Sequence, residues 1–169
     1  MCQKPKTMIE IVDYRPEHQP YWEKLNRDWI SVHFEIEPFD EWVLQNPEEA
    51  ILKDGGAILI ALYDGQVAGT AGLRKMNDTF EFTKMVVDEA FRRKGIAETL
   101  CYACFRKAKE LGATYVILYS NSVQAAAIKM YEKIGFKHLP VENTVYKRAN
   151  VKMGINLDEV LNKHLTETH

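Results

Sequence analysis

The chain has 169 residues, of which 46% are hydrophobic and 27% charged, and its 22 basic and 24 acidic residues give a net charge of −2. This size and composition predict a single globular domain over residues 1–169 that buries its own core. The near-neutral charge argues against a protein whose whole surface binds nucleic acid, and no apolar run approaches the roughly 20 residues that span a bilayer.

The N-terminal segment, MCQKPKTMIEIVDY, has two lysines but no apolar stretch behind them. A secretory signal peptide needs such a stretch, so we expect a cytoplasmic protein that does not associate with membranes. Within this segment apolar and polar residues alternate from Met8 to Tyr14, which predicts a first strand.

Two helices are predicted next. The first begins between Pro16 and Pro20, and the second runs from Phe39 to Leu52, with Pro47 interrupting it. The apolar positions that we expect the first helix to bury are Tyr21, Trp22, Leu25, Trp29, Ile30 and Val32.

The connection between these helices, HFEIEPFDEW from His33 to Trp42, combines four acidic residues, a histidine and three aromatics. A loop of this composition can line a polar pocket, and it can equally be a solvated connection. Both interpretations stay open from the sequence.

Three antiparallel strands are predicted to follow. Ala57–Tyr63 and Val67–Lys75 flank Asp64-Gly65, a dipeptide typical of tight hairpin turns. A second turn around Asn77-Asp78 leads into a third strand, Thr79–Val87, on which Glu81, Thr83, Met85 and Val87 should share one face by alternation.

The second half of the chain predicts further helices and strands. A helix from Ile96 to Leu111 ends at Gly112, and Thr114–Ser120 is a continuous apolar strand. The pair Cys101 and Cys104 lies inside that helix on its apolar side, where reduced core cysteines are expected rather than a redox pair.

The next predicted helix is capped by Asn121, with Gln124 in the capping-box position and an inner face of Ala127, Tyr131 and Ile134. Strands around Phe136–Leu139 and Val145–Leu157 and a terminal helix complete the chain. The order of elements predicts an α/β (α+β) protein with a mixed sheet and helices packed on it.

The stretch RRKGIAETL, Arg92 to Leu100, places three cations and a glycine at the turn between a predicted strand and a predicted helix. The start of a helix leaves about four backbone N–H groups unpaired and carries partial positive charge, so this turn predicts an anion site. Its spacing fits neither a nucleoside-triphosphate P-loop nor a dinucleotide-binding motif. It has the form [QR]-x-x-G-x-[GA].

This motif resembles the pyrophosphate-binding signature of the GCN5-related N-acetyltransferases (GNAT family). KMVVDEAFRRKGIAETL is similar to the family's central strand–turn–helix segment, and NSVQAAAIKMYEKIGF, residues 121–136, is similar to its second motif. The resemblance covers roughly residues 8–155. It implies a central mixed sheet with splayed middle strands, acetyl-CoA as cosubstrate and no metal. The five scattered histidines also lack the spacing of metal ligands.

The resemblance also implies which residues contact acetyl-CoA. Backbone amides around Arg93–Glu98 would hold the pyrophosphate, and the exposed edge of the central strand would pair with the pantetheine arm. The family's usual asparagine is Gln124 here, which leaves Asn121 as an alternative contact. The residues assigned to the cofactor are Met85, Val86, Val87, Arg92, Arg93, Lys94, Gly95, Ile96, Ala97, Glu98, Asn121, Gln124 and Ala127.

For catalysis, the resemblance implies Tyr131 as the general acid that protonates the leaving thiolate, and Glu81 as the base. The alternative candidates for the base, or for binding the acceptor, are His33, Glu35 and Glu37 of the acidic loop. That loop favours a polar or cationic small molecule as the acceptor, with a peptide amine as the other option.

A non-catalytic acyl-CoA sensor or adaptor on the same fold is the alternative function, since a fold permits an activity without proving it. Nucleic-acid binding through the basic turn is disfavoured by the balanced charge. Whether the chain forms a homodimer stays open.

Overall fold

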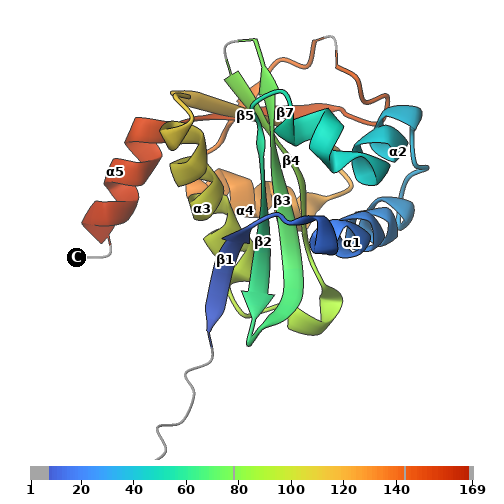
Figure 1. The fold of residues 1–169 in the computed structure, drawn as a ribbon. Coiled ribbons are helices and arrows are strands. Elements are labelled where there is room, and N and C mark those ends of the chain that lie inside the picture. The colour runs from blue at the N-terminus through green and yellow to red at the C-terminus, as the bar shows by residue number, and fades with distance from the viewer. Residues whose placement is uncertain (1–7, 78, 143, 168–169) are drawn as a thin grey trace, which may run out of the picture.

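A computed structural model describes residues 8–77, 79–142 and 144–167 (Figure 1). A seven-stranded sheet in the order β1-β2-β3-β4-β5-β7-β6 runs through the molecule. Its strands are β1 (Ile9–Asp13), β2 (Ala57–Tyr63), β3 (Gln66–Met76), β4 (Thr79–Val87), β5 (Tyr115–Ser120), β6 (Lys137–Leu139) and β7 (Val151–Asn156). The helices are α1 (Gln19–Ser31), α2 (Pro38–Gln45), α3 (Ile96–Glu110), α4 (Ala125–Ile134) and α5 (Leu157–Glu167), with short turns at Pro16–His18, Glu48–Leu52 and Glu89–Phe91.

Helices cover both faces of this sheet, and each face has its own core. Figure 1 shows α1 and α2 on one side of β2–β4 and α3 and α5 on the other. The two faces follow from the alternation of β2, because Ile58 and Ile60 pack with Trp22 of α1 while Leu59 and Ala61 pack with the α3 side. The predicted mixed sheet with flanking helices is confirmed.

The sheet changes character between β4 and β5. The strands from β1 to β4 are antiparallel neighbours, whereas β4 and β5 are parallel and pair only at Phe80–Val116 and Glu81–Ile117. Beyond Glu81 the two strands separate, which confirms the predicted splay.

A bulge interrupts β4 where it separates from β5. The register with β3 shifts between Thr70 and Gly72, and Lys84 has a φ of 55°. The Thr70 hydroxyl donates a hydrogen bond of 2.9 Å to the Lys84 carbonyl, and Asn26 of α1 donates to the Thr70 hydroxyl at 3.1 Å. These side chains fix the irregular backbone from the neighbouring strand and helix.

The bulge makes one prediction wrong. Phe82, before it, lies in the core on the α3 face, and Met85 and Val87, after it, pack against that same core. Glu81 and Thr83 therefore do not share a face with Met85 and Val87, because the extra residue reverses the alternation. Lys84 instead points to α2 on the opposite face, where it binds Asp40.

Two other predictions need correction. Tyr21 in α1 and Val32 just after it are exposed, whereas the polar Asn26 is buried, where its amide donates to the Trp22 carbonyl and the Thr70 hydroxyl. The strand predicted for Val145–Leu157 begins only at Val151, and the described residues before it form a loop that folds back over α2.

Cys101 and Cys104 are free and buried, as predicted for reduced core cysteines, and burial raises the pKa of both thiols. Cys2 and Asp78 lie outside the described residues. In the part of the chain that the structure describes, no helix has the length and apolar character to cross a membrane.

Candidate active site

A cavity of about 320 Å³ opens where β4 and β5 diverge. Its walls come from the separated parts of both strands, from α1 and from the starts of α3 and α4. Ten of the residues singled out from the sequence line this one cavity: Glu81, Met85, Val86, Val87, Arg92, Ala97, Asn121, Gln124, Ala127 and Tyr131. Motifs that are far apart in the sequence thus meet at the gap in the sheet.

The turn before α3 lies at one end of the cavity. Gly95 has a φ of +79° and precedes the first residue of α3, and no atom lies within 4 Å of the place where a Cβ would be. The first hydrogen bond of the helix runs from the Thr99 amide to the Gly95 carbonyl at 3.1 Å. The amides of Ile96, Ala97 and Glu98 precede it and are the ones a helix start leaves for an anion.

The cations of this turn differ in position. Arg92 lines the cavity, and its guanidinium lies 5.8 Å from the ring centre of Trp29. Arg93 and Lys94 are exposed outside the cavity wall, and the Lys94 ammonium lies 5.1 Å from the ring centre of Tyr63. The side chain of Ile96 is buried in the core, so only its backbone faces the turn.

Tyr131 on α4 reaches the cavity from the core. Its ring packs against Phe82 and Phe136, and only 8% of the residue is exposed. Burial raises the pKa of Tyr131 above its ordinary value, and Cys101 and Cys104 add to the shift. The phenol therefore stays protonated at any physiological pH, as a proton donor must.

The start of α4 corrects a prediction. The residue that precedes the helix is Gln124, without a side-chain cap, and no capping box forms. Asn121 lies three residues earlier, where its side-chain oxygen accepts from the Val123 amide at 3.0 Å and its amide donates to the Arg148 carbonyl at 2.6 Å. Asn121 thus anchors the loop that follows β6 instead of capping α4.

Glu81 is buried on β4 and belongs to an ion pair. Arg74 of β3 approaches Oε1 of Glu81 with Nε at 2.9 Å and Nη2 at 2.8 Å. Next to this pair, the hydroxyls of Thr83 and Tyr146 are 3.3 Å apart. Burial raises the pKa of Tyr146, and the charge of Glu81 raises it further.

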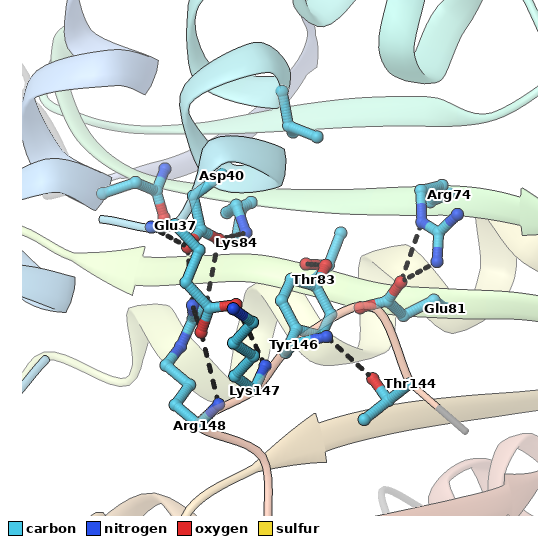
Figure 2. A network of polar contacts seen from close by, with 12 residues as sticks. Glu37, Asp40, Arg74, Glu81, Thr83, Lys84, Thr144, Tyr146, Lys147 and Arg148 are labelled. Carbon is cyan, nitrogen blue, oxygen red and sulfur yellow. Dashed lines mark hydrogen bonds and ion pairs between the residues drawn. The ribbon is translucent and has the colours of Figure 1, made fainter. Parts of the chain in front are cut away.

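A second polar cluster surrounds Asp40, which is fully buried at the start of α2 (Figure 2). Lys84 donates to its Oδ1 at 2.9 Å, and Arg148 donates to both of its oxygens, at 2.6 and 3.0 Å. Burial alone would raise the pKa of Asp40, but the hydrogen bonds from Arg148 and the charge of Lys84 outweigh it and hold this pKa below its ordinary value. Burial lowers the pKa of Lys84.

The acidic loop contributes one aromatic side chain, Phe34, to the cavity wall, and its acids lie outside that wall. His33 and Glu35 are exposed and do not line the cavity. Glu37 caps α2, and its carboxylate accepts from the backbone amides of Lys147 and Arg148 at 2.9 and 3.2 Å. It holds the later loop in place and stays outside the cavity wall.

The sequence reasoning missed Lys84, Tyr146 and Arg148, all of which line the cavity. Lys84 was missed because strict alternation would point it away from Glu81, and only the bulge redirects it. Tyr146 and Arg148 fall in a segment predicted as strand. The one signal available was the concentration of aromatic and basic residues in VYKRAN, residues 145–150.

Comparison with known proteins agrees with this geometry. Residues 13–136 match the model of the acetyltransferase (GNAT) family. An acetyltransferase of the GNAT family from Staphylococcus aureus Mu50 superposes with a TM-score of 0.79 at 23% identity, over 89% of this chain and 99% of that one. The yncA protein of Salmonella typhimurium, solved with its cofactor acetyl-CoA, gives a TM-score of 0.70 at 20% identity, over 89% and 95%.

Among curated proteins, the human (Homo sapiens) protein named N-acetylaspartate synthetase is 29% identical over 142 residues. The match covers 82% of this chain but 43% of the human protein, so the chain spans less than half of that relative. At the identities of the two solved structures, the likeness concerns the fold.

Proposed function

Because the chain belongs to the acetyltransferase (GNAT) family, we propose that it transfers the acetyl group of acetyl-CoA directly to a primary amine of a small molecule or peptide. The observation that carries the proposal is the cavity at the β4–β5 gap, since it joins an anion-binding helix start to a buried tyrosine. The name of the human relative supports an amino group as the acceptor.

The binding step uses backbone groups. The amides at the start of α3 hold the pyrophosphate, with Arg92 beside them. Among the described residues, the edge of β4 from Met85 to Val87 has no strand partner on the β5 side, so it is available to the amides of the pantetheine arm. A β4 amide that points into the gap also stabilises the negative charge that forms on the thioester oxygen.

The chemical step needs two proton transfers. The amine attacks the thioester carbon and loses a proton to Glu81, directly or through water, while the C–S bond breaks and the Tyr131 phenol protonates the leaving sulfur. Both Arg74 contacts fall on Oε1 of Glu81, and the Tyr146 hydroxyl also lies against this carboxylate. Lining of the same cavity by Glu81 and Tyr131 supports this assignment.

Two measurements test the proposal. Titration calorimetry should detect acetyl-CoA binding, and thiol release with a panel of amines that includes amino acids should reveal turnover. Binding without turnover on any amine would favour the alternative, an acyl-CoA sensor or adaptor. No heat with acetyl-CoA or other acyl-CoA thioesters would reject both functions.

A further inference from the structure

The charges that face the cavity are unevenly distributed. Lys84, Arg92 and Arg148 line it, whereas Glu81 is the one carboxylate among the described residues that does. Asp40 and Glu37, which pair with Lys84 and Arg148, lie behind them and outside the cavity wall. Near the loop of Tyr146 and Arg148, the cavity therefore presents positive charge.

Arg148 retains unused hydrogen-bond donors. A guanidinium has five N–H groups. One from Nη2 and one from Nη1 bind Asp40, and the second from Nη1 binds Glu37, which makes three. The Nε–H and the second Nη2–H have no partner among the described residues. These two groups form one edge of the guanidinium, the geometry that holds a carboxylate through two parallel hydrogen bonds.

Lys84 is in a similar position. Its side chain is 3% exposed, and its ammonium makes one hydrogen bond within the described residues, to Asp40. An ammonium has three donors, and leaving the others without acceptors is costly in a buried site. The Lys84 ammonium and the Arg148 guanidinium each lie 5.0 Å from the ring centre of Tyr146. Both cations therefore belong to one subsite built around this ring.

The hydroxyl of Tyr146 lies near a negative charge, whereas its ring lies near two positive charges. Its hydroxyl contacts Thr83 at 3.3 Å and lies beside Glu81. Figure 2 shows the Arg74–Glu81 pair and the Asp40 cluster on opposite sides of Tyr146. Glu81, which can bind an ammonium, thus lies on one side of Tyr146. Lys84 and Arg148, which can bind a carboxylate, lie on the other side of this ring.

We propose that the acceptor amine carries a carboxylate, as an amino acid does, and that the free edge of Arg148, assisted by Lys84, binds that carboxylate. This inference rests on the proposed acetyl transfer and narrows its acceptor class. It also departs from the cationic acceptor that the acidic loop suggested, because the acids of that loop are either exposed or already paired with cations of the protein.

Matched acceptors test the carboxylate requirement. We would measure kcat/KM for L-aspartate, L-glutamate, L-alanine and β-alanine, each against the compound in which every carboxylate is an amide, corrected for the fraction of free amine. The best acid should exceed its amide by at least about 10-fold, because a site built for a charged group rejects the analogue that lacks it. Equal or better rates with the amides would overturn the inference.

Arg148→Gln tests the residue. We expect kcat/KM for the acids to fall about 10- to 100-fold, mainly through KM, and kcat/KM for the amides to change less than about twofold. Arg148→Lys should recover part of the loss. The matched control is Lys147→Gln, which removes the same charge from the same loop at an exposed side chain and should behave as wild type.

The outcomes separate the two proposals. A purely structural role of Arg148 would lower the rates with acids and amides alike, and would refute the inference while acetyl transfer stands. Asp40 keeps Lys84 as a partner in Arg148→Gln, and thermal unfolding checks that the variant folds. Acetyl-CoA binding without acetylation of any amine would reject the enzymatic function and the inference together.

Discussion

At the scale of single residues, Tyr131 combines two properties that rarely occur together in a core side chain. Its ring is packed between Phe82 and Phe136, yet it lines the cavity. The ring contributes to the core and we propose that the hydroxyl acts in the site, so the two contributions can be separated by removing one oxygen.

Tyr131→Phe should lower kcat by about 100-fold or more, because general-acid catalysis contributes about 10²- to 10⁴-fold. The free energy of unfolding should change by less than about 1 kcal/mol, since the apolar ring remains. Steady-state kinetics and urea unfolding measure the two effects. Tyr21→Phe, on the exposed side of α1, is the control, and an unchanged kcat in Tyr131→Phe would reject the acid role.

Asp40 compensates two cations from different parts of the chain. Asp40→Asn leaves Lys84 and Arg148 without their shared buried carboxylate, and we expect it to lower the free energy of unfolding by about 3 to 5 kcal/mol. Asp28→Asn breaks a surface pair with the exposed Lys24 and should leave the free energy of unfolding nearly unchanged. Similar losses in the two variants would show that the cluster does not stabilise the fold.

The same carboxylate predicts a pH dependence. The pKa of Asp40 is lowered in the folded state, so at acid pH the unfolded chain binds the extra proton first and stability falls as the pH falls. The difference between wild type and Asp40→Asn should therefore be full at neutral pH and shrink below about pH 4, the ordinary range of an aspartate. Urea unfolding as a function of pH measures this. A difference that stays constant with pH would contradict the assignment.

At the scale of elements, α3 has a glycine with positive φ at each end. Gly95 lies at its start, beside the cavity, and Gly112 follows its end with a φ of +93°. Neither position has an atom within 4 Å of an added Cβ, so each substitution strains only the backbone. The two ends differ in their relation to the anion site.

Gly95→Ala and Gly112→Ala should each cost about 1 kcal/mol of stability, because alanine tolerates positive φ poorly. Only Gly95→Ala should weaken acetyl-CoA binding, by about 10-fold, since it shifts the amides that we assign to the pyrophosphate. Calorimetry and thermal unfolding provide the two readings. Equal affinity in both variants would remove the turn from the binding site.

Elements also differ in how well the sequence predicts them. The strands Ala57–Tyr63 and Thr79–Val87 and the helix from Ile96 were predicted from periodicity and turn residues, and the structure confirms them. The turn motif predicted an anion site, which stays a prediction, and Arg92 and Ala97 of the motif line the cavity. The features that were predicted wrongly depend on contacts between elements, such as the Thr70–Lys84 hydrogen bond that stabilises the bulge.

The loop of residues 144–150 is the clearest example of this limit. Its residues favour strand locally, but Glu37 and Asp40, more than 100 positions earlier, bind its backbone and Arg148. Local propensity carries no information about such partners. Sequence patterns therefore did not predict the residues that we assign to the acceptor, whereas contiguous motifs predicted those that we assign to acetyl-CoA.

At the scale of the whole molecule, the sheet consists of two sections that meet at only two residue pairs, Phe80–Val116 and Glu81–Ile117. A ligand in the gap contacts both sections, so acetyl-CoA should stabilise the protein as a unit. At 100 times its Kd it should add about 2.7 kcal/mol to the free energy of unfolding, and thermal unfolding should show one transition that moves upward. Two separate transitions, or no shift, would contradict this expectation.

The gap between β4 and β5 has a consequence for recognition. Beyond Glu81 the facing edges of β4 and β5 form no ladder with each other in the described residues, so their free amides and carbonyls need other partners. If acetyl-CoA binds in the gap as we propose, the amides of its pantetheine arm replace water at these edges at nearly equal enthalpy. These contacts add little net affinity, but a molecule of similar shape that lacks amides would leave the backbone groups of both strand edges without hydrogen-bond partners. The free-energy cost of these unsatisfied groups makes the gap selective for ligands that carry amides.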